Sequence, residues 1–140
     1  MAKEPDHADL LARHGAVSSF TFGDGPALCA ELLALVRSGR KTATTGALRD
    51  YDSGEEPMPR KGERSIALNW DGTPAPLIET REVSICRFRE VGEDFALAEG
   101  ENHDLEGWRA DHRAYFDRNG GYDPDMMVVC ERFALIEDFQ

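Results

Sequence analysis

Residues 27–45 read ALCAELLALVRSGRKTATT, and this stretch decides how the first half of the chain folds. Its apolar side chains recur at the spacing of one helix face: Leu28, Leu32, Leu35 and Val36. Asp24 is placed to cap the start of this helix, and Pro26 suits its first turn. Gly39 is a common helix stop. The stretch therefore predicts an amphipathic helix that packs on a core and ends near Gly39.

The segment Gly39–Thr45 combines a glycine, two cations and three hydroxyl groups directly after that helix. The helix delivers Arg40 and Lys41 at its carboxyl end, where positive charge is favoured. A lysine beside a threonine can make a weak hydroxyl nucleophilic, because a neutral amine accepts the hydroxyl proton and an ammonium stabilises an oxyanion. Threonines after a helix also cap, turn or begin a strand without any chemistry. The residue types alone leave both interpretations open.

The rest of the chain predicts an α+β domain. Short β-prone runs bounded by turn residues predict four strands: Ser18–Phe22, Ser65–Trp70, Leu77–Phe88 and Met127–Ile136. A hairpin signal, Asp71 to Pro74, separates the second from the third. Further helices are expected at Asp94–Glu99 and Asp104–Arg118, and Asp50–Lys61 is expected to be a polar loop. Paired strands without a βαβ rhythm favour a mostly antiparallel sheet or barrel with helices against its openings.

The 140 residues suit one domain, and their formal net charge of −11 is unevenly spread. From Arg37 to Arg64 seven basic residues accompany five acidic ones, whereas from Glu79 onward seven basic residues accompany sixteen acidic ones. A protein that coats phosphates is basic overall, so duplex DNA is not an expected partner. A nucleoside or a short single strand at one local positive spot fits better. An ordinary solvated acidic surface also explains the carboxyl-terminal charge.

Several classes of protein and site are not expected. No apolar run approaches the ~18–20 residues of a membrane span, and the polar start from Met1 to Asp9 lacks the regions of a signal peptide. The three cysteines form no C-x-x-C pair and are expected to be reduced, partly buried thiols of a cytoplasmic protein: Cys29, Cys86 and Cys130. No ligand spacing indicates a metal, and no glycine-rich motif points to a nucleotide cofactor.

Aromatic residues and a histidine share one face of the expected helix Asp104–Arg118: Trp108, His112, Tyr115 and Phe116. Helical spacing favours core packing over base stacking for these rings. His112 is expected to be half-buried with satisfied hydrogen bonds. Trp70, at a strand end, is open to either use.

Several separate segments, in order along the chain, resemble an ASCH-domain protein. They are Ala27–Thr45, Pro59–Ile66, Ile78–Val83, Ala98–Glu101, the Trp108 helix and Val129–Phe133. The resemblance implies a PUA-like, mostly antiparallel β-barrel flanked by helices, a cleft associated with RNA or nucleosides, and a cytoplasmic setting. It divides the chain into a helical or flexible extension at 1–17 and a single ASCH domain at 18–140.

Some ASCH proteins are amidohydrolases that remove the acetyl group from N4-acetylcytidine with a lysine, a threonine three residues later and a downstream glutamate. Residue by residue, the resemblance places these roles on Lys41, Thr44 and Glu101, with Glu99 as a competitor for the last. The expected substrate contacts are Arg40, Thr45, Arg49 and Trp70. At the position of the usual family arginine this chain has Gly46, so Arg40 or Arg49 would have to anchor an anionic or carbonyl group instead.

The chemistry implied by the resemblance sets conditions on the geometry. Thr44 would attack the acyl carbon, Lys41 would accept its proton, and Glu101 would protonate the leaving cytosine amine. Lys41 must then be partly neutral at about pH 7, and a protonated Glu101 adds no opposing charge. Residues three apart in a regular strand face opposite sides, so Lys41 and Thr44 meet only if the backbone turns or bulges. In a plain strand Thr45 would be the better partner.

Two other functions use the same basic spot. In a ribonuclease the RNA 2′-hydroxyl is the nucleophile, so Thr44 would be dispensable, while Glu101 acts as base and Lys41 and Arg40 stabilise the phosphorane. A binding module without catalysis would hold a phosphate there. The intact Lys-x-x-Thr pattern favours the amidohydrolase, with a small nucleoside or single-stranded RNA as partner. Whether the protein is a monomer or a dimer is left open.

Overall fold

The computed structural model describes residues 15–139, so most of the expected extension at 1–17 lies outside the described residues. In chain order the elements are β1 (Ala16–Phe20), α2 (Pro26–Arg37), β2 (Ala43–Ala47), α3 (Leu48–Asp52), β3 (Arg64–Leu68), β4 (Pro74–Arg87), the 3-10 turn η1 (Phe88–Glu90), α4 (Glu93–Ala98), α5 (Leu105–Arg118) and β5 (Met127–Asp138). The expected strands and helices are confirmed to within a few residues. The expected loop Asp50–Lys61 is wrong at its start, because it begins inside the short helix α3.

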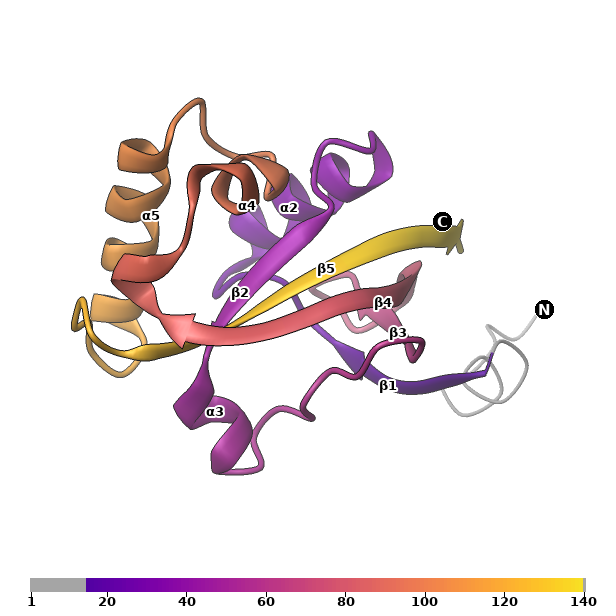
Figure 1. The fold of residues 1–140 in the computed structure, drawn as a ribbon. Coiled ribbons are helices and arrows are strands. Elements are labelled where there is room, and N and C mark those ends of the chain that lie inside the picture. The colour runs from indigo at the N-terminus through magenta and orange to yellow at the C-terminus, as the bar shows by residue number, and fades with distance from the viewer. Residues whose placement is uncertain (1–14, 140) are drawn as a thin grey trace, which may run out of the picture.

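The strands form one curved sheet in the order β1-β3-β4-β5-β2. The pairs β3–β4, β4–β5 and β5–β2 are antiparallel, and only the β1–β3 pair of these four is parallel. The expected mostly antiparallel sheet is therefore confirmed. Register shifts between Leu77 and Ile78 and between Thr80 and Glu82 mark bulges at which long β4 bends. The sheet curls into a half-barrel with helices around it (Figure 1). It stays open along one side, because its edge strands β1 and β2 do not pair.

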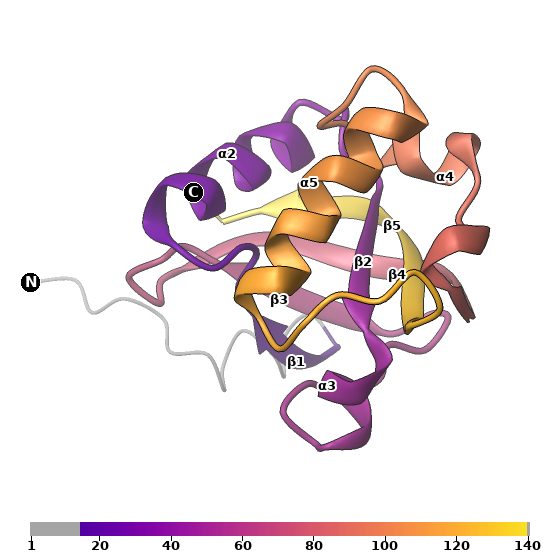
Figure 2. The ribbon, with the colours of Figure 1, turned by 90° about the vertical axis from the view of Figure 1, so that its left-hand side faces the viewer.

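Two apolar clusters hold the helices to this sheet. The first packs α2 on the strands and includes Phe22, Ile78 and Phe133. The second packs α4 and α5 against β2 and β5 and contains Trp108 and Phe116, which are 0% and 2% exposed. Figure 2 shows α5 lying across the sheet. The expected core role of these two aromatic rings is confirmed.

The start of α2 corrects one detail. The residue that caps the helix is Gly25, not Asp24, and it makes no side-chain cap. Pro26 occupies the first turn, which places the cap immediately before it. The Asp24 carboxylate instead accepts hydrogen bonds from Arg118 at 3.0 Å and from Asn119 at 2.9 Å. Asp24 therefore ties the segment before α2 to the carboxyl end of α5.

Other sequence expectations concern thiols, membranes and metals. Cys29, Cys86 and Cys130 are all free, and the first and last are buried. No helix among residues 15–139 has the length and apolar character needed to cross a membrane. Within the same residues, no group of three His, Cys, Asp or Glu side chains is arranged to hold a metal ion.

Candidate functional site

A cavity of about 680 Å³ is lined by residues of both edge strands, β1 and β2. Phe20 of β1 and Thr44 of β2 line it from the sheet, and His112 lines it from α5. Small-molecule sites typically have volumes of ~300–1,000 Å³. The cavity is therefore large enough for a nucleoside.

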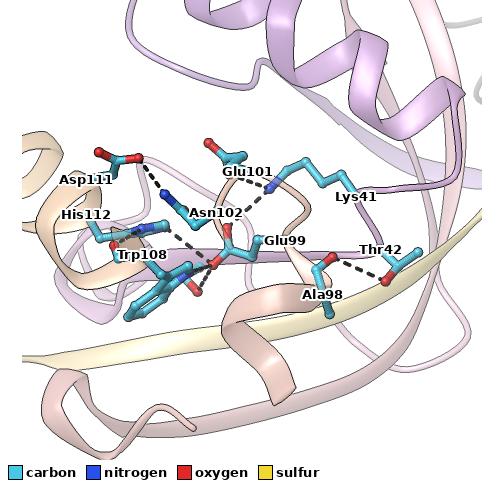
Figure 3. Close-up of polar contacts among 10 residues, drawn as sticks. Lys41, Thr42, Ala98, Glu99, Glu101, Asn102, Trp108, Asp111 and His112 are labelled. Carbon is cyan, nitrogen blue, oxygen red and sulfur yellow. Dashed lines mark hydrogen bonds and ion pairs between the residues drawn. The ribbon is translucent and has the colours of Figure 1, made fainter. Parts of the chain in front are cut away.

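Lys41 lies two residues before β2, at the wall of this cavity, and is 2% exposed. Its Nζ is 3.2 Å from Glu99 Oε1 and 3.2 Å from Glu101 Oε2 (Figure 3). The Phe22 ring centroid is 5.7 Å from the same nitrogen. A buried ammonium needs partners of this kind, because an unpaired charge away from water is strongly destabilising. Lys41 and Glu101, 60 residues apart, are thus brought into contact as predicted.

Gly100 makes this contact possible. Its φ is +80°, a conformation that favours glycine. A Cβ at this position would lie 2.5 Å from the carbonyl oxygen of Arg40 and 3.0 Å from the backbone nitrogen of Lys41. The turn after α4 therefore rests directly on the backbone that leads into β2. Because of this approach, Glu99 and Glu101 reach the Lys41 ammonium from one short turn.

Glu99 is fully enclosed, at 2% exposure, and makes several polar contacts. Its Oε2 accepts from the Thr45 hydroxyl at 2.8 Å and from Trp108 Nε1 at 2.7 Å, and it faces His112 Nε2 at 3.4 Å. Burial raises the pKa of Glu99, but Lys41, His112 and Thr45 together lower it to about 2. Glu99 is therefore a permanent anion at neutral pH.

His112 lies between two acceptors. Its Nδ1 is 2.9 Å from the Trp108 carbonyl oxygen, and its Nε2 faces the Glu99 carboxylate. Only the protonated ring can donate from both nitrogens at once. Burial lowers the pKa of His112, but its hydrogen bond to Glu99 and the negative charge of Glu99 outweigh burial and raise it overall. The expected half-buried, satisfied histidine is confirmed, and the raised pKa favours its charged form beside Glu99.

The two carboxylates beside Lys41 differ in their freedom. Glu99 has polar contacts with four side chains through its two oxygens, whereas the Glu101 side chain is 19% exposed and, among the described residues, hydrogen-bonds to Lys41 alone. Both line the cavity. This difference favours Glu101 for proton transfer to a bound molecule and Glu99 for holding Lys41 in place.

The two threonines of β2 have different surroundings. Strand β2 pairs with β5 in unbroken register, with Thr44 opposite Glu131 and Thr45 opposite Cys130. In such a regular strand neighbouring side chains point to opposite faces. Thr45 donates to Glu99 and so joins the network of Lys41, as expected for a plain strand. Thr44 lines the cavity, and no residue in the described range 15–139 hydrogen-bonds its hydroxyl.

Three expected substrate contacts lie elsewhere. The Arg40 side chain is exposed, and Trp70 is 50% exposed in the turn after β3. Arg49 is directed by α3 toward the segment after α5, where its Nη2 donates to the carbonyl oxygens of Asn119 at 3.2 Å and Gly121 at 2.8 Å. None of these three side chains lines the cavity. The expectation that they contact a ligand there is therefore not supported.

The family model described as the ASCH domain matches residues 18–137 of this chain. The chain belongs to the ASCH domain family. The crystal structure of an ASCH domain from Lactobacillus crispatus JV V101 is 30% identical, with a TM-score of 0.78 over 91% of this chain and 84% of that one. A protein from Enterococcus faecalis V583 is 31% identical, with a TM-score of 0.81 over 95% and 86%.

A more distant structure, ASCH from Zymomonas mobilis, is 11% identical with a TM-score of 0.53 over 86% of this chain and 68% of that one, which shows likeness of fold alone. No curated protein matches the chain. The half-barrel with flanking helices is thus the α+β, PUA-like fold expected from the resemblance.

Two cavity residues of this ASCH domain were missed in the sequence. Tyr51 of α3 lines the cavity, and its Oη lies 2.6 Å from where a Cβ of Gly46 would be. Glu131 of β5 accepts a 2.7 Å hydrogen bond from Thr80, and burial raises its pKa although that hydrogen bond lowers it. The available signals were a glycine inside a strand, which often marks a close approach, and an acid within an apolar run.

Proposed function

We propose that this protein is a hydrolase that removes the acyl group from N4-acylated cytosine nucleosides such as N4-acetylcytidine. The proposal rests on the Lys41–Glu101 pair, 3.2 Å apart at the wall of a cavity that Thr44 also lines. These are the three residues onto which the ASCH resemblance carries the amidohydrolase roles. The cytoplasmic setting stays a prediction.

The ion pair offers a route for a proton. A substrate that fills the cavity displaces water, and loss of water disfavours the charged forms of both Lys41 and Glu101. A proton can then pass from Lys41 Nζ to Glu101 Oε2 across their existing hydrogen bond. This transfer produces a neutral amine and a carboxylic acid. Glu99 stays ionised throughout, because His112 balances its charge.

The reaction then has two halves. Because strand alternation turns Thr44 away from the Lys41 network, Thr44 Oγ1 is proposed to attack the acyl carbon and to pass its proton to Lys41 through a water molecule in the cavity, while Glu101 gives its proton to N4 as the carbon–nitrogen bond breaks. Cytidine leaves, Thr44 carries the acyl group as an ester, and the ammonium–carboxylate pair is restored. Water then attacks the ester and gives a proton to Glu101, which returns it to the Thr44 oxygen as the carboxylic acid departs.

The charge of the cavity favours a neutral nucleoside over RNA. Eight acidic residues line it: Glu31, Asp50, Glu56, Glu63, Glu99, Glu101, Asp111 and Glu131. Only Lys41, Arg60 and Arg118 line it as lysine or arginine side chains of the described residues. Such a surface repels phosphate groups, which a ribonuclease or an RNA-binding module has to hold.

The decisive experiment measures release of cytidine from N4-acetylcytidine by the wild type and by variants. Thr44→Ala, Glu101→Gln and Lys41→Arg are expected to lower kcat/KM by ~10²–10⁴-fold, the last because a guanidinium cannot act as a base. Thr42→Ala is the matched control, because its exposed hydroxyl donates only to the Ala98 carbonyl, at 3.3 Å. Its kcat/KM is expected to stay within about threefold of the wild type, the scale of a loss worth ~0.6 kcal/mol.

The same proteins are incubated with labelled single-stranded RNA. Full activity of Thr44→Ala on N4-acetylcytidine would contradict the proposed nucleophile, and loss of activity in Thr45→Ala but not in Thr44→Ala would transfer that role to Thr45. RNA cleavage that survives Thr44→Ala would identify a ribonuclease instead. Salt-sensitive RNA binding without turnover of either substrate would identify a binding module.

A further inference from the structure

The Tyr51 hydroxyl lies beside Gly46 of β2, at a position that is open because Gly46 has no side chain. Tyr51 belongs to α3, which follows β2 directly, and its half-buried ring lines the cavity. A Cβ at Gly46 would lie 2.6 Å from Tyr51 Oη and 2.9 Å from its Cε2. No side chain larger than hydrogen fits at that strand position while the ring stays in place. The phenol therefore stands where the side chain of residue 46 would otherwise project.

This position makes the phenol a neighbour of Thr44. Residues two apart on a strand share a face and are separated by ~6.4–6.8 Å along it. Thr44 and Gly46 are such a pair, and their register with β5 is unbroken. The Tyr51 hydroxyl therefore lies on the same strand face as Thr44, and the carboxylate of Glu131, directly opposite Thr44 on β5, is another polar group there. A substrate bound over this face can direct its carbonyl oxygen toward the phenol while Thr44 attacks the carbonyl carbon.

The phenol is a proton donor in this environment. Burial raises the pKa of Tyr51, and the nearby carboxylates of Glu131, Glu56 and Asp50 raise it further. The hydroxyl therefore keeps its proton at neutral pH. No residue in the described part of the chain forms a hydrogen bond with it, so the donor is available to a ligand.

The proposed reaction leaves a role for such a donor. Attack on an amide carbonyl creates negative charge on its oxygen, and removing one donor to that oxygen typically costs ~10²–10³-fold in rate. Lys41 cannot supply this stabilisation while it is the neutral amine that accepts the Thr44 proton. Neither Arg40 nor Arg49 lines the cavity.

We propose that Tyr51 Oη donates a hydrogen bond to the acyl carbonyl oxygen of the substrate and stabilises the oxyanion formed when Thr44 attacks. This assignment rests on the proposed function. Tyr51 is then a catalytic residue supplied by α3, and Gly46 is the residue that admits it.

The kinetic test replaces Tyr51 with phenylalanine, which removes the hydroxyl and keeps the ring. With N4-acetylcytidine as substrate, Tyr51→Phe is expected to lower kcat by ~10²-fold and to raise KM by no more than ~10-fold, because the phenol contacts the carbonyl of the bound substrate as well as the oxyanion. Tyr122→Phe is the matched control, because Tyr122 lies outside this cavity and packs edge-on against Phe88. It is expected to keep wild-type kcat, and both variants are expected to unfold near the wild-type temperature. Wild-type kcat in a folded Tyr51→Phe protein would overturn the assignment.

A binding test separates this inference from the proposed function. Calorimetric titrations compare N4-acetylcytidine with cytidine, which lacks the acyl carbonyl, in the Thr44→Ala background with and without Tyr51→Phe. Loss of the phenol is expected to weaken N4-acetylcytidine by ~3–10-fold and cytidine by less than about twofold. If the wild type does not hydrolyse N4-acetylcytidine but Tyr51→Phe still weakens its binding more than that of cytidine, the proposed hydrolase is refuted and the Tyr51 contact is supported. If the wild type hydrolyses N4-acetylcytidine but Tyr51→Phe changes the Kd of both ligands equally, only the Tyr51 contact is refuted. If the protein neither hydrolyses nor binds N4-acetylcytidine, both the hydrolase and the Tyr51 contact are refuted.

Discussion

The buried ammonium group of Lys41 lies at the centre of the candidate site, and the two carboxylates that contact it, those of Glu99 and Glu101, have different roles. Glu99 is held by Thr45, Trp108 and His112 and is ionised at any pH near neutrality. Glu101 hydrogen-bonds to Lys41 alone among the described residues and faces the cavity. The fixed anion keeps Lys41 in place, while the less constrained one can exchange a proton with it.

The charge on His112 predicts a pH-dependent stability. The groups that face it are Glu99, Glu101 and the Trp108 carbonyl oxygen. Because its pKa is higher in the folded than in the unfolded chain, its contribution is fully present below the unfolded value of ~6.5 and is lost as pH rises through the folded value. His112→Gln is therefore expected to lose ~1.5–3 kcal/mol at about pH 6 and less at about pH 9.

Thermal unfolding across that pH range measures this effect. His103→Gln is the control, because its side chain is exposed in the loop before α5. The control is expected to follow the wild-type curve at every pH. A loss of stability in His112→Gln that is the same at both ends of the range would show that the imidazole is neutral in the folded protein.

At this scale the sequence predicted part of the site. The pairing of Lys41 with Glu101 followed from resemblance, and Thr45 as the threonine in the Lys41 network followed from strand alternation. The charged state of His112 could not be predicted, because it depends on a carboxylate 13 positions earlier whose burial is a tertiary property. Trp70 and Arg49, expected to contact a substrate, do not line the cavity, because the side chains that meet there are also set by contacts far apart in the sequence.

At the scale of elements, the turn between α4 and α5 is the part that builds the site. Gly100→Ala introduces a Cβ 2.5 Å from the Arg40 carbonyl oxygen at a φ of +80°. Gly72→Ala has a similar φ of +89° but meets nothing within 4 Å. The control is expected to lose only the ~1–2 kcal/mol of left-handed backbone strain. Gly100→Ala is expected to lose more, and to lower kcat/KM by at least ~10²-fold, because the turn must move away from Lys41.

Chemical denaturation and N4-acetylcytidine kinetics together test this. Equal stability losses in the two variants, with normal kinetics in both, would show that the turn does not set the position of the carboxylates.

Periodic patterns predicted most of the elements but did not predict the short helix α3. The twelve residues of α2 and the fourteen of α5 are long enough to show an apolar stripe. The five residues of α3 are not, so its segment was expected to be a loop and Tyr51 was overlooked. The parallel pairing of β1 with β3 was also unexpected, since which strands become neighbours depends on contacts far apart in the chain.

At the scale of the whole molecule, charge governs which ligands can enter. The net charge is −11, and eight acidic residues line the cavity against three lysine or arginine residues. A 5′-phosphate on N4-acetylcytidine is therefore expected to lower kcat/KM by at least ~10-fold at low salt, and added salt is expected to reduce that penalty by screening. Steady-state kinetics with the nucleoside and its monophosphate, each at two ionic strengths, measure both effects. A monophosphate that is the better substrate at low salt would contradict the electrostatic argument.

The unpaired edges of the half-barrel have a consequence for motion. Because β1 and β2 share no hydrogen bonds and both border the cavity, a bound nucleoside would be the bridge between them. Occupancy would add a link between two strands that are otherwise joined only through the rest of the sheet. Amide protons at the rims of both strands would then exchange with solvent more slowly together, in a single concerted response to one small molecule.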